Sequence, residues 1–295
     1  MGLFYNFSKE GPGVDKDAPK KKGVFRYFEI LARKFWKLCQ VNFLFMVCSI
    51  PMFLIYYLLV TPSIVSFVQI FEQGELAMSQ DDIAMYSTML TLFFTVSATT
   101  FIGSGPASAA MAYIMRCFAR EEHAWIFSDF FKKMKENFKQ GIIVAVVDLV
   151  VLFVGTFTIR FYYNYFMQNG QTIWFFLMWL LILCMIIFVF MHYYIYQLMV
   201  TFENKTRNLF KNAVILALST LPVNMLFTLL FGFISFMIFT VFTPIMSIIL
   251  SFVLLAGLLR FPFEFYAESV IRRKILNNID NSESDESDES NEIVE

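Results

Sequence analysis

Long stretches without a charged side chain alternate with short basic segments along the chain. Asp, Glu, Lys and Arg are absent from four stretches: 38–71, 83–115, 161–202 and 212–259. Each stretch exceeds the roughly 20 residues with which a helix crosses the hydrocarbon core of a bilayer. The pattern therefore predicts membrane-spanning helices.

The last of these stretches is too long for one helix, and Thr243-Pro244 near its middle is typical of a tight turn. We therefore expect two spans there, and one more near Gly141, interrupted only by Asp148. The predicted fold is all-α, a bundle of six transmembrane helices, with spans near the following residues: 41–62, 85–115, 141–161, 172–197, 212–241 and 245–263.

The distribution of basic residues predicts the orientation. All but one of the 23 lysines and arginines precede the first span, follow the last, or lie between spans two and three or four and five. Only Arg160 lies on the opposite side. Because basic residues near span ends are retained in the cytoplasm, we expect a multi-pass protein of the cell membrane with both termini cytoplasmic.

The remaining segments divide the chain into four parts. Residues 1–40 are a basic cytoplasmic N-terminus, and residues 41–263 are the transmembrane domain. A basic cytoplasmic segment covers 264–276. The tail, 277–295, is acidic and of low complexity, so it cannot bury enough apolar surface to fold, and we expect it to be disordered.

Two amphipathic helices are expected on the inner membrane surface. Apolar residues recur at helical spacing at these positions: Val24, Phe28, Leu31, Phe35 and Leu38, and again Phe127, Phe130, Met134 and Phe138. Lysines and arginines occupy the other faces, which is typical of helices that lie on anionic headgroups. Docking of a cytoplasmic partner is the alternative.

The second predicted span contains a run of small residues with a Gly-Pro break, Gly103-Ser-Gly105-Pro106. Small residues allow close helix packing, which is one explanation. The other is an interrupted helix that exposes backbone groups to a substrate, as in transporters.

Asp148 is the only Asp, Glu, Lys or Arg well inside a predicted span. An ionised carboxylate is costly in hydrocarbon, so Asp148 should face the bundle interior, be paired, or hold a proton. His192 of the fourth span is a candidate partner. These two residues, with Gly103, Gly105 and Pro106, form the candidate substrate or proton site, and a purely structural hydrogen bond is the alternative.

Arg160, Tyr162 and Trp174 form a second candidate site, at the outer face. Aromatic rings beside a guanidinium can contact a sugar or an anion, although the same residues also describe an interfacial aromatic belt.

Motifs for enzyme chemistry are missing from the sequence. There is no Gly-rich phosphate loop, no paired catalytic Cys and His, and no serine nucleophile elbow. Glu121-Glu122-His123 does not have the spacing of a metal site. We therefore expect no enzymatic activity, no cofactor, no metal and no nucleic-acid partner.

Several sequence blocks carry a family resemblance. They are Gly2-Leu-Phe-Tyr-Asn6, Gly11-Pro-Gly13, Asp17-Ala-Pro-Lys-Lys-Lys-Gly23, Arg33-Lys-Phe-Trp-Lys37, Arg116-Cys-Phe-Ala-Arg-Glu-Glu-His123 and Ser128-Asp129-Phe130. From residue 2 to about residue 276, the chain resembles the YesL family of bacterial membrane proteins, a domain of unknown function. The family is found mostly in Gram-positive bacteria, often encoded beside ABC-type sugar importers. The resemblance implies a role near carbohydrate uptake and supplies no catalytic residues.

Three functions remain open from the sequence. The leading interpretation is an accessory protein of ABC-type carbohydrate uptake, with importer subunits as partners. Candidate docking residues lie in one cytoplasmic loop: Arg116, Arg120, Glu121, Glu122 and His123. The alternatives are a self-contained small-molecule carrier that uses the broken second span and Asp148, and a non-transporting scaffold or sensor. A homo-oligomer is compatible with each of them.

Overall fold

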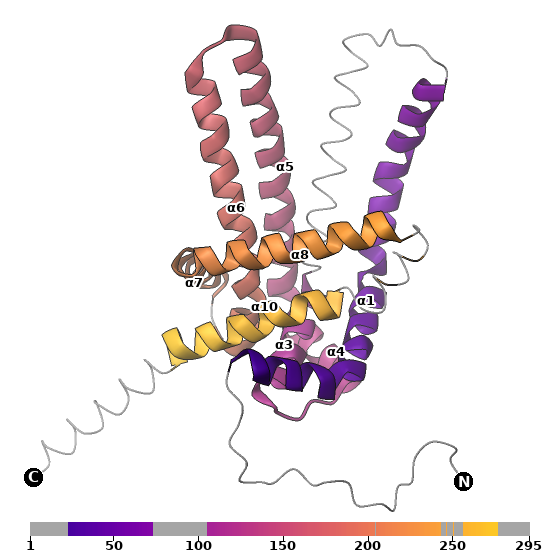
Figure 1. Cartoon of the computed structure of the whole chain (residues 1–295), viewed down its shortest axis with the longest axis vertical. Coiled ribbons are helices and arrows are strands. Elements are labelled where there is room, and N and C mark those ends of the chain that lie inside the picture. Colours follow the sequence, from indigo (N-terminus) through magenta and orange to yellow (C-terminus); the bar gives the residue numbers. More distant parts are fainter. Residues whose placement is uncertain are drawn as a thin grey trace, which may run out of the picture.

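The computed structural model describes residues 23–72, 105–203, 205–242, 246, 250 and 256–276, and every element in these ranges is helical. The helices, shown in Figure 1, are α1 (Val24–Glu72), α3 (Pro106–Arg120), α4 (Ile126–Glu136), α5 (Phe138–Asn169), α6 (Thr172–Thr201), α7 (Thr206–Ser219), α8 (Leu221–Val241), α10 (Ala256–Ile271) and the π-helix η2 (Arg272–Leu276). The all-α prediction is confirmed for this part of the chain.

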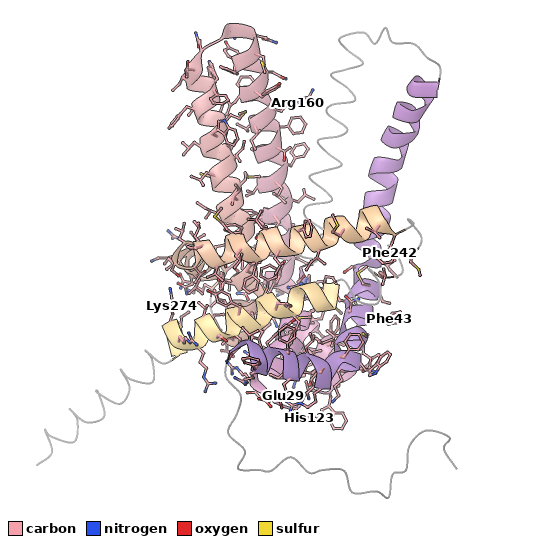
Figure 2. The ribbon with its side chains drawn as sticks, viewed as in Figure 1. Glu29, Phe43, His123, Arg160, Phe242 and Lys274 are labelled. Carbon is pink, nitrogen blue, oxygen red and sulfur yellow. The ribbon has the colours of Figure 1, made fainter. Side chains whose placement is uncertain are left out.

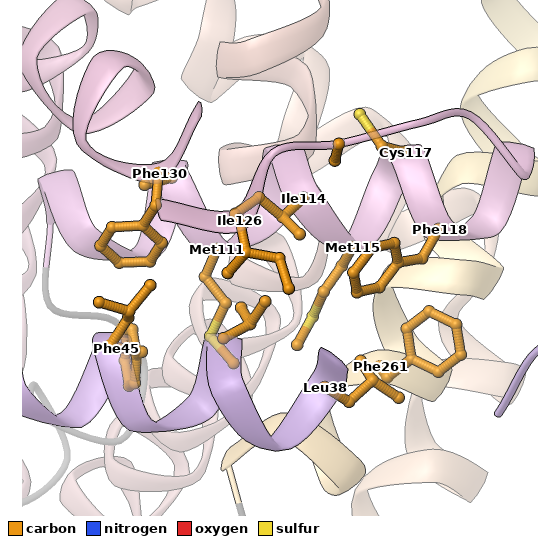
Figure 3. Close-up of a cluster of buried hydrophobic side chains, with 14 of the residues drawn as sticks. Leu38, Phe45, Met111, Ile114, Met115, Cys117, Phe118, Ile126, Phe130 and Phe261 are labelled. Carbon is orange, nitrogen blue, oxygen red and sulfur yellow. The ribbon is translucent and has the colours of Figure 1, made fainter. Parts of the chain in front are cut away.

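α3 is the central helix, because it contacts α1, α4, α5, α6 and α10. Its sequence is rich in alanine, and a short side chain allows neighbouring helices to approach from several sides. One of its faces packs with α1, α4 and α10 in an apolar cluster that includes Leu38, Met115, Phe118 and Phe261 (Figure 3). This cluster fixes the end of the molecule that holds residues 116–128, called the 116–128 loop below. Only 121–125 connect the two helices, because Arg116 and Arg120 of the predicted loop lie in the last turns of α3 and residues 126–128 begin α4.

α5 and α6 rise side by side as a hairpin in Figure 1, joined at Gly170, whose φ of 65° favours glycine. Many of their apolar side chains are exposed, such as Val146 at 55% and Phe176 at 62%. Among the described residues, these two helices are long and apolar enough to cross a membrane, and the bent pair α7 and α8 adds a third if it forms one span. The exposed apolar surface indicates a membrane protein.

The predicted fifth span, 212–241, is divided into two helices. α7 ends at Ser219 and α8 begins at Leu221, with a bend of 83° between them. Pro222 explains the break, because it has no backbone N–H and its ring would clash with the carbonyl of Leu218 in a continuing helix. The hydroxyl of Thr220 donates to the carbonyl of Leu216 at 2.8 Å at this break.

α1 joins two segments that the sequence separates. The predicted amphipathic helix and the first span, 41–62, are continuous in α1, whose first turns lie across the base of the molecule in Figure 1 while later turns rise. Val24 and Phe28 of the predicted apolar stripe are 67% and 59% exposed, whereas Ile30 and Leu38 are buried. Leu38 belongs to the predicted stripe and Ile30 does not, so the protein core takes only the later part of the predicted face of this helix.

The remaining boundaries compare as follows. α5 and α6 extend the predicted spans 141–161 and 172–197 at one or both ends, and α4 corresponds to the second amphipathic helix. α3 and α10 cover the ends of the predicted spans 85–115 and 245–263, and α10 runs on to Ile271. Residues 1–22, 73–104 and 277–295 lie outside the described residues, and so do the predictions made for them.

The labelled charged side chains separate along the hairpin direction. Arg160 lies toward the tip of the α5–α6 hairpin, whereas Glu29, His123 and Lys274 lie at the opposite end (Figure 2). The orientation that the basic residues predict stays a prediction.

Candidate functional site

Asp148 of α5 and His192 of α6 form a buried pair. Asp148 Oδ1 and His192 Nε2 are 2.7 Å apart, and the two side chains are 1% and 3% exposed. The pair lies on two adjacent helices, so it joins α5 to α6 below the hairpin turn. The partnership of these residues was proposed from the sequence, and the structure brings them together.

The second ring nitrogen of His192 determines where hydrogens lie in the pair. His192 Nδ1 is 2.9 Å from the carbonyl oxygen of Phe188, which can only accept a hydrogen bond, so Nδ1 must carry the hydrogen. The short contact between Nε2 and Asp148 then requires a second hydrogen between those atoms, on either the imidazolium or the carboxylic acid. The pair therefore holds one exchangeable proton in this conformation.

Close backbone packing positions Asp148. The buried face of α5 is Gly141, Val144, Asp148, Leu152 and Gly155, at helical spacing. Gly141 lies against the start of α3: a Cβ there would be 2.6 Å from Pro106 N. α5 can reach α3 at this distance because Gly141 has no side chain, and Asp148 lies two turns farther along the same face.

Gly105 and Pro106 form the start of α3, and residues 73–104 before them lie outside the described residues. Gly105 has φ 60° and precedes α3, and Pro106 is the first residue of that helix, where its missing N–H costs nothing. A Cβ on Gly105 would lie 2.9 Å from the carbonyl oxygen of Gly141. These two candidate residues therefore lie beside the helix that bears Asp148, and Gly103 is outside the described residues.

A second polar cluster lies between α3, α6 and α10. Arg260 Nε donates to Glu264 Oε1 at 2.9 Å, and Arg260 Nη1 donates to Ser108 Oγ at 3.1 Å. The guanidinium carbon of Arg260 is 5.5 Å from the ring centroid of Tyr196, within reach of a cation–π interaction. Gln197 Nε2 donates to the carbonyl of Ala112 at 3.3 Å.

Four buried oxygens of these clusters have no hydrogen-bond partner in the described part of the chain: Asp148 Oδ2, Tyr196 Oη, Gln197 Oε1 and Glu264 Oε2. Nearly all buried polar groups in proteins are paired, with protein atoms or with buried water. These oxygens can all accept hydrogen bonds, so they are suited to water or to a ligand that donates through hydroxyl or N–H groups.

α10 extends the polar cluster toward the surface. Glu268 Oε1 accepts from Arg120 Nε at 2.6 Å, and Arg120 Nη1 is 4.0 Å from Glu122 Oε1. The side chain of Glu122 is 51% exposed, whereas Glu268 is 9% exposed. Charged side chains therefore lead from the protein interior to the 116–128 loop.

The candidate docking residues divide into an inward and an outward set. Arg116 Nη1 donates to the carbonyl of Val200 and to Thr201 Oγ1, both at 2.9 Å. Arg120 pairs with Glu268, so these two arginines join α3 to α6 and α10. Glu122 is exposed, and so is His123, whose ring lies 4.8 Å from that of Trp125.

Glu121 ends α3 in a left-handed conformation, with φ 63°, which is uncommon outside glycine. Its carboxylate accepts from Arg33 Nη2 at 2.6 Å and from Arg26 Nε at 3.2 Å, joining the loop to α1. The hydrogen bond from Arg33 holds the pKa of Glu121 below its usual value. These ion pairs offset the cost of the backbone conformation.

The aromatic residues of the second candidate site meet at the tip of the hairpin. The ring centroids of Tyr162 and Trp174 are 5.7 Å apart, and those of Tyr165 and Trp174 are 4.7 Å apart. Arg160 lies on α5 near this cluster in sequence (Figure 2). Both the ligand-contact and the belt interpretation remain compatible with this arrangement.

A shallow groove of about 440 Å³ lies on the surface between α1 and α4, lined by Trp36, Cys39, Gln40, Phe43 and Phe127. Its lining is mainly apolar, and Trp36 is 77% exposed. No group of three or more metal-ligating side chains was found within the described residues.

The sequence alone does not predict the charged face of α10, or that Tyr196 and Gln197 of α6 belong to the same polar cluster. The sequence places Arg260 among the basic residues that follow the last span, and it predicts Glu264 and Glu268 in a cytoplasmic segment. Their spacing of four residues was the available signal, because it places all three on one helix face.

Comparison with known proteins gives one match. Residues 38–165 match the model of a family described as "Protein of unknown function, DUF624". The matched segment includes Gly105, Gly141 and Asp148 but not His192 or α10. No curated protein and no solved structure matches the chain.

Proposed function

We propose that this membrane protein is a small-molecule carrier in which the Asp148–His192 pair is the proton-binding site. The observation that carries the proposal is the 2.7 Å contact in a buried position, together with the hydrogen on Nδ1 that the Phe188 carbonyl requires. Ionisable residues inside membrane helices are costly and are characteristic of proton pathways. The proposal adopts six spans, cytoplasmic termini and no enzymatic activity.

The geometry supplies a mechanism for coupling a proton to a conformational change. With its proton, the pair links α5 to α6 by a charge-assisted hydrogen bond, a type of interaction worth about 1.5–3 kcal/mol. Without it, the carboxylate of Asp148 and the lone pair of Nε2 are two acceptors that repel each other at this distance. Proton release therefore favours separation of α5 from α6, and proton binding favours the closed contact.

The unpartnered oxygens indicate how a substrate would bind. Asp148 Oδ2 and Tyr196 Oη are buried acceptors without a partner in the described region. A polyol or a sugar presents several hydroxyl donors, and such a site rejects compounds that cannot satisfy its buried acceptors. The resemblance to a family associated with carbohydrate uptake supports the same substrate class.

The test is uptake of labelled mono- and disaccharides into proteoliposomes with and without a pH gradient. We expect the gradient to drive accumulation by the wild-type protein and not by Asp148→Asn, whose amide can still donate to Nε2 but holds no exchangeable proton. Glu136→Gln, which breaks an exposed ion pair with Lys133, is the control and should behave like the wild type. Equal accumulation by Asp148→Asn would exclude the pair as the coupling site.

An accessory role in ABC-type carbohydrate uptake is the second candidate. The groove between α1 and α4 favours it, because exposed Trp36 and Phe127 line an apolar surface on the half of the molecule that the proposed orientation assigns to the cytoplasm. Aromatic residues of this kind are common anchors in protein interfaces.

This role predicts that importer subunits co-purify in stoichiometric amounts with the gently solubilised protein from its host. Replacement of Trp36 by Glu should remove them, while Glu136→Gln, at an exposed ion pair of α4, should not. A homo-oligomer without other subunits would contradict the accessory role.

A further inference from the structure

α10 has a face of charged side chains that is largely buried in the protein, at a place where apolar side chains would be expected. Arg260, Glu264 and Glu268 are spaced by four residues, so successive side chains lie on one face roughly 6 Å apart. Glu264 and Glu268 are 4% and 7% exposed. Burying such groups is expensive, and apolar residues of similar size usually stabilise a packed interface as well or better. Packing alone therefore does not account for two buried acids one turn apart.

The inner end of this face reaches the Asp148–His192 pair through Tyr196. The rings of His192 and Tyr196, one turn apart on α6, have centroids 6.4 Å apart. The guanidinium carbon of Arg260 lies 5.5 Å from the centroid of the Tyr196 ring, so Tyr196 has His192 on one side and Arg260 on the other. Tyrosine Oη both donates and accepts, so it can relay a proton between neighbours on its two sides.

The outer end of the face reaches solvent. Glu264 lies one turn before Glu268, which binds Arg120, and Arg120 lies 4.0 Å from the half-exposed Glu122. The basic residues around the 116–128 loop predict that this end faces the cytoplasm. Titratable groups thus occur at intervals from the cytoplasmic surface to the buried pair.

Three of the unpartnered oxygens belong to residues of α6 and α10 in this cluster: Tyr196 Oη, Gln197 Oε1 and Glu264 Oε2. A buried water needs two to four polar partners, and the guanidinium of Arg260, which donates to Glu264 Oε1 and to Ser108 Oγ, brings hydrogen-bond donors to the same cluster. Bridging waters would connect the titratable side chains across the gaps.

We propose that Glu268, Glu264 and Tyr196 form a proton path that connects the cytoplasmic face to the Asp148–His192 pair. The inference rests on the proposed function, because it supplies the proton that the pair binds. A proton enters near Glu122, passes to Glu268 and Glu264, and reaches Asp148 through Tyr196. Arg260 and Arg120 hold the two carboxylates in place and offset their charge.

The charged and titratable groups around the path come from five helices. They are Arg26 and Tyr27 of α1, Arg116 and Arg120 of α3, Asp148 of α5, His192, Tyr193, Tyr194 and Tyr196 of α6, and Arg260, Glu264, Tyr266 and Glu268 of α10. The two acids of α10 are the carboxylates nearest to the cytoplasmic end among these groups, so their removal should affect proton delivery more than the pair itself.

The test is the rate at which the pair responds to a pH jump in oriented proteoliposomes. Vesicles are selected with an affinity tag at the N-terminus, so that the Glu122 end contacts the mixed buffer. Rapid-mixing infrared spectroscopy follows the carboxyl band of Asp148, identified by its absence in Asp148→Asn. We expect Glu268→Gln, Glu264→Gln and Tyr196→Phe to slow the response by roughly 100-fold, the lower end of what a positioned proton-transfer group contributes.

Two further variants control for the possibility that a substitution slows the response only by disturbing the structure. Glu268→Asp keeps a carboxylate and should restore most of the rate, whereas a merely structural defect would not follow the titratable group. Glu136→Gln removes an exposed glutamate whose ion pair is also 2.6 Å long, and it should leave the rate unchanged.

The outcomes separate the path from the proposed function. A wild-type rate in Glu264→Gln and Glu268→Gln, with a normal Asp148 band, would overturn the path and leave the pair as the proton site. A wild-type protein whose Asp148 band does not respond to the jump would overturn both proposals.

Discussion

Gly141→Ala should separate the helices that position the candidate site. A Cβ at residue 141 would lie 2.6 Å from Pro106 N, 2.8 Å from Pro106 Cα and 3.0 Å from the carbonyl carbon of Gly105. All three are backbone atoms at the start of α3, which cannot rotate away. Because ordinary contacts between such atoms are about 3.5–4.0 Å, α5 must move away from α3 by roughly 1 Å.

The expected cost follows from two opposing effects. Overfilling a packed interface typically costs about 1–3 kcal/mol. Replacing glycine by alanine inside a helix returns about 0.5–1 kcal/mol. We therefore expect Gly141→Ala to lower the free energy of unfolding by about 1–2 kcal/mol.

Gly155→Ala is a matched control on the same buried face of α5. The Cβ there would lie 2.5 Å and 2.6 Å from Cε and Sδ of Met185. These atoms end a flexible side chain that can adopt another rotamer, so the clash is relieved cheaply. Alanine stabilises the helix here by the same amount as at residue 141. The net change in the free energy of unfolding should therefore be near zero.

The assay is thermal unfolding of both variants in detergent micelles, followed by circular dichroism. Gly141→Ala should unfold at a lower temperature than wild type, and Gly155→Ala near the wild-type temperature. If Gly141→Ala were as stable as Gly155→Ala, the close approach of α5 to Gly105 and Pro106 would be refuted.

Two further variants test contacts on either side of the site. The ion pairs of Glu121 with Arg33 and Arg26 hold its pKa below the usual value, so they stabilise the fold above about pH 4.3 and the effect is lost as pH falls through the lowered pKa. Glu121→Gln should thus cost about 1 kcal/mol at pH 7 and little at pH 3, measured by thermal unfolding; an equal cost at both pH values would contradict the ion pairs. Tyr194 donates to Asn224 Oδ1 at 2.9 Å in a buried position between α6 and α8. Tyr194→Phe leaves that acceptor unpaired and should lower the free energy of unfolding in micelles by about 1–3 kcal/mol, whereas an unchanged value would show that the bond does not hold α8.

The apolar helices and the buried pair could be anticipated because their signals are local. Charge-free stretches indicate helices in lipid, and a lone acid such as Asp148 within one of them needs a partner. His192 was the natural candidate, since the sequence has only two histidines and the other lies in a charged loop. The break near Thr220 was signalled by Pro222, although its 83° angle depends on packing against α6.

The charged face of α10 could not be found in the same way. Arg260, Glu264 and Glu268 lie in a segment whose composition resembles a cytoplasmic end, and their burial results from α3 and α6 packing over them. The ion pairs of Glu121 could not be predicted for the same reason, because they depend on a segment that is distant in the sequence. It occurs in a charged run typical of an exposed loop, but α1 folds back to pair with it.

The most direct test of the account is the protonation of the two ring nitrogens of His192. His123→Gln removes the only other histidine, so ¹⁵N-histidine labelling gives the NMR signals of His192 alone in detergent micelles or bilayers. We predict that Nδ1 carries a hydrogen at every pH at which the fold persists. We predict that Nε2 shares a hydrogen with Asp148 in the wild type, and that in Asp148→Asn it is only an acceptor. A hydrogen on Nε2 with a bare Nδ1, or signals of Nε2 that are the same in wild type and Asp148→Asn, would contradict the proposed proton site.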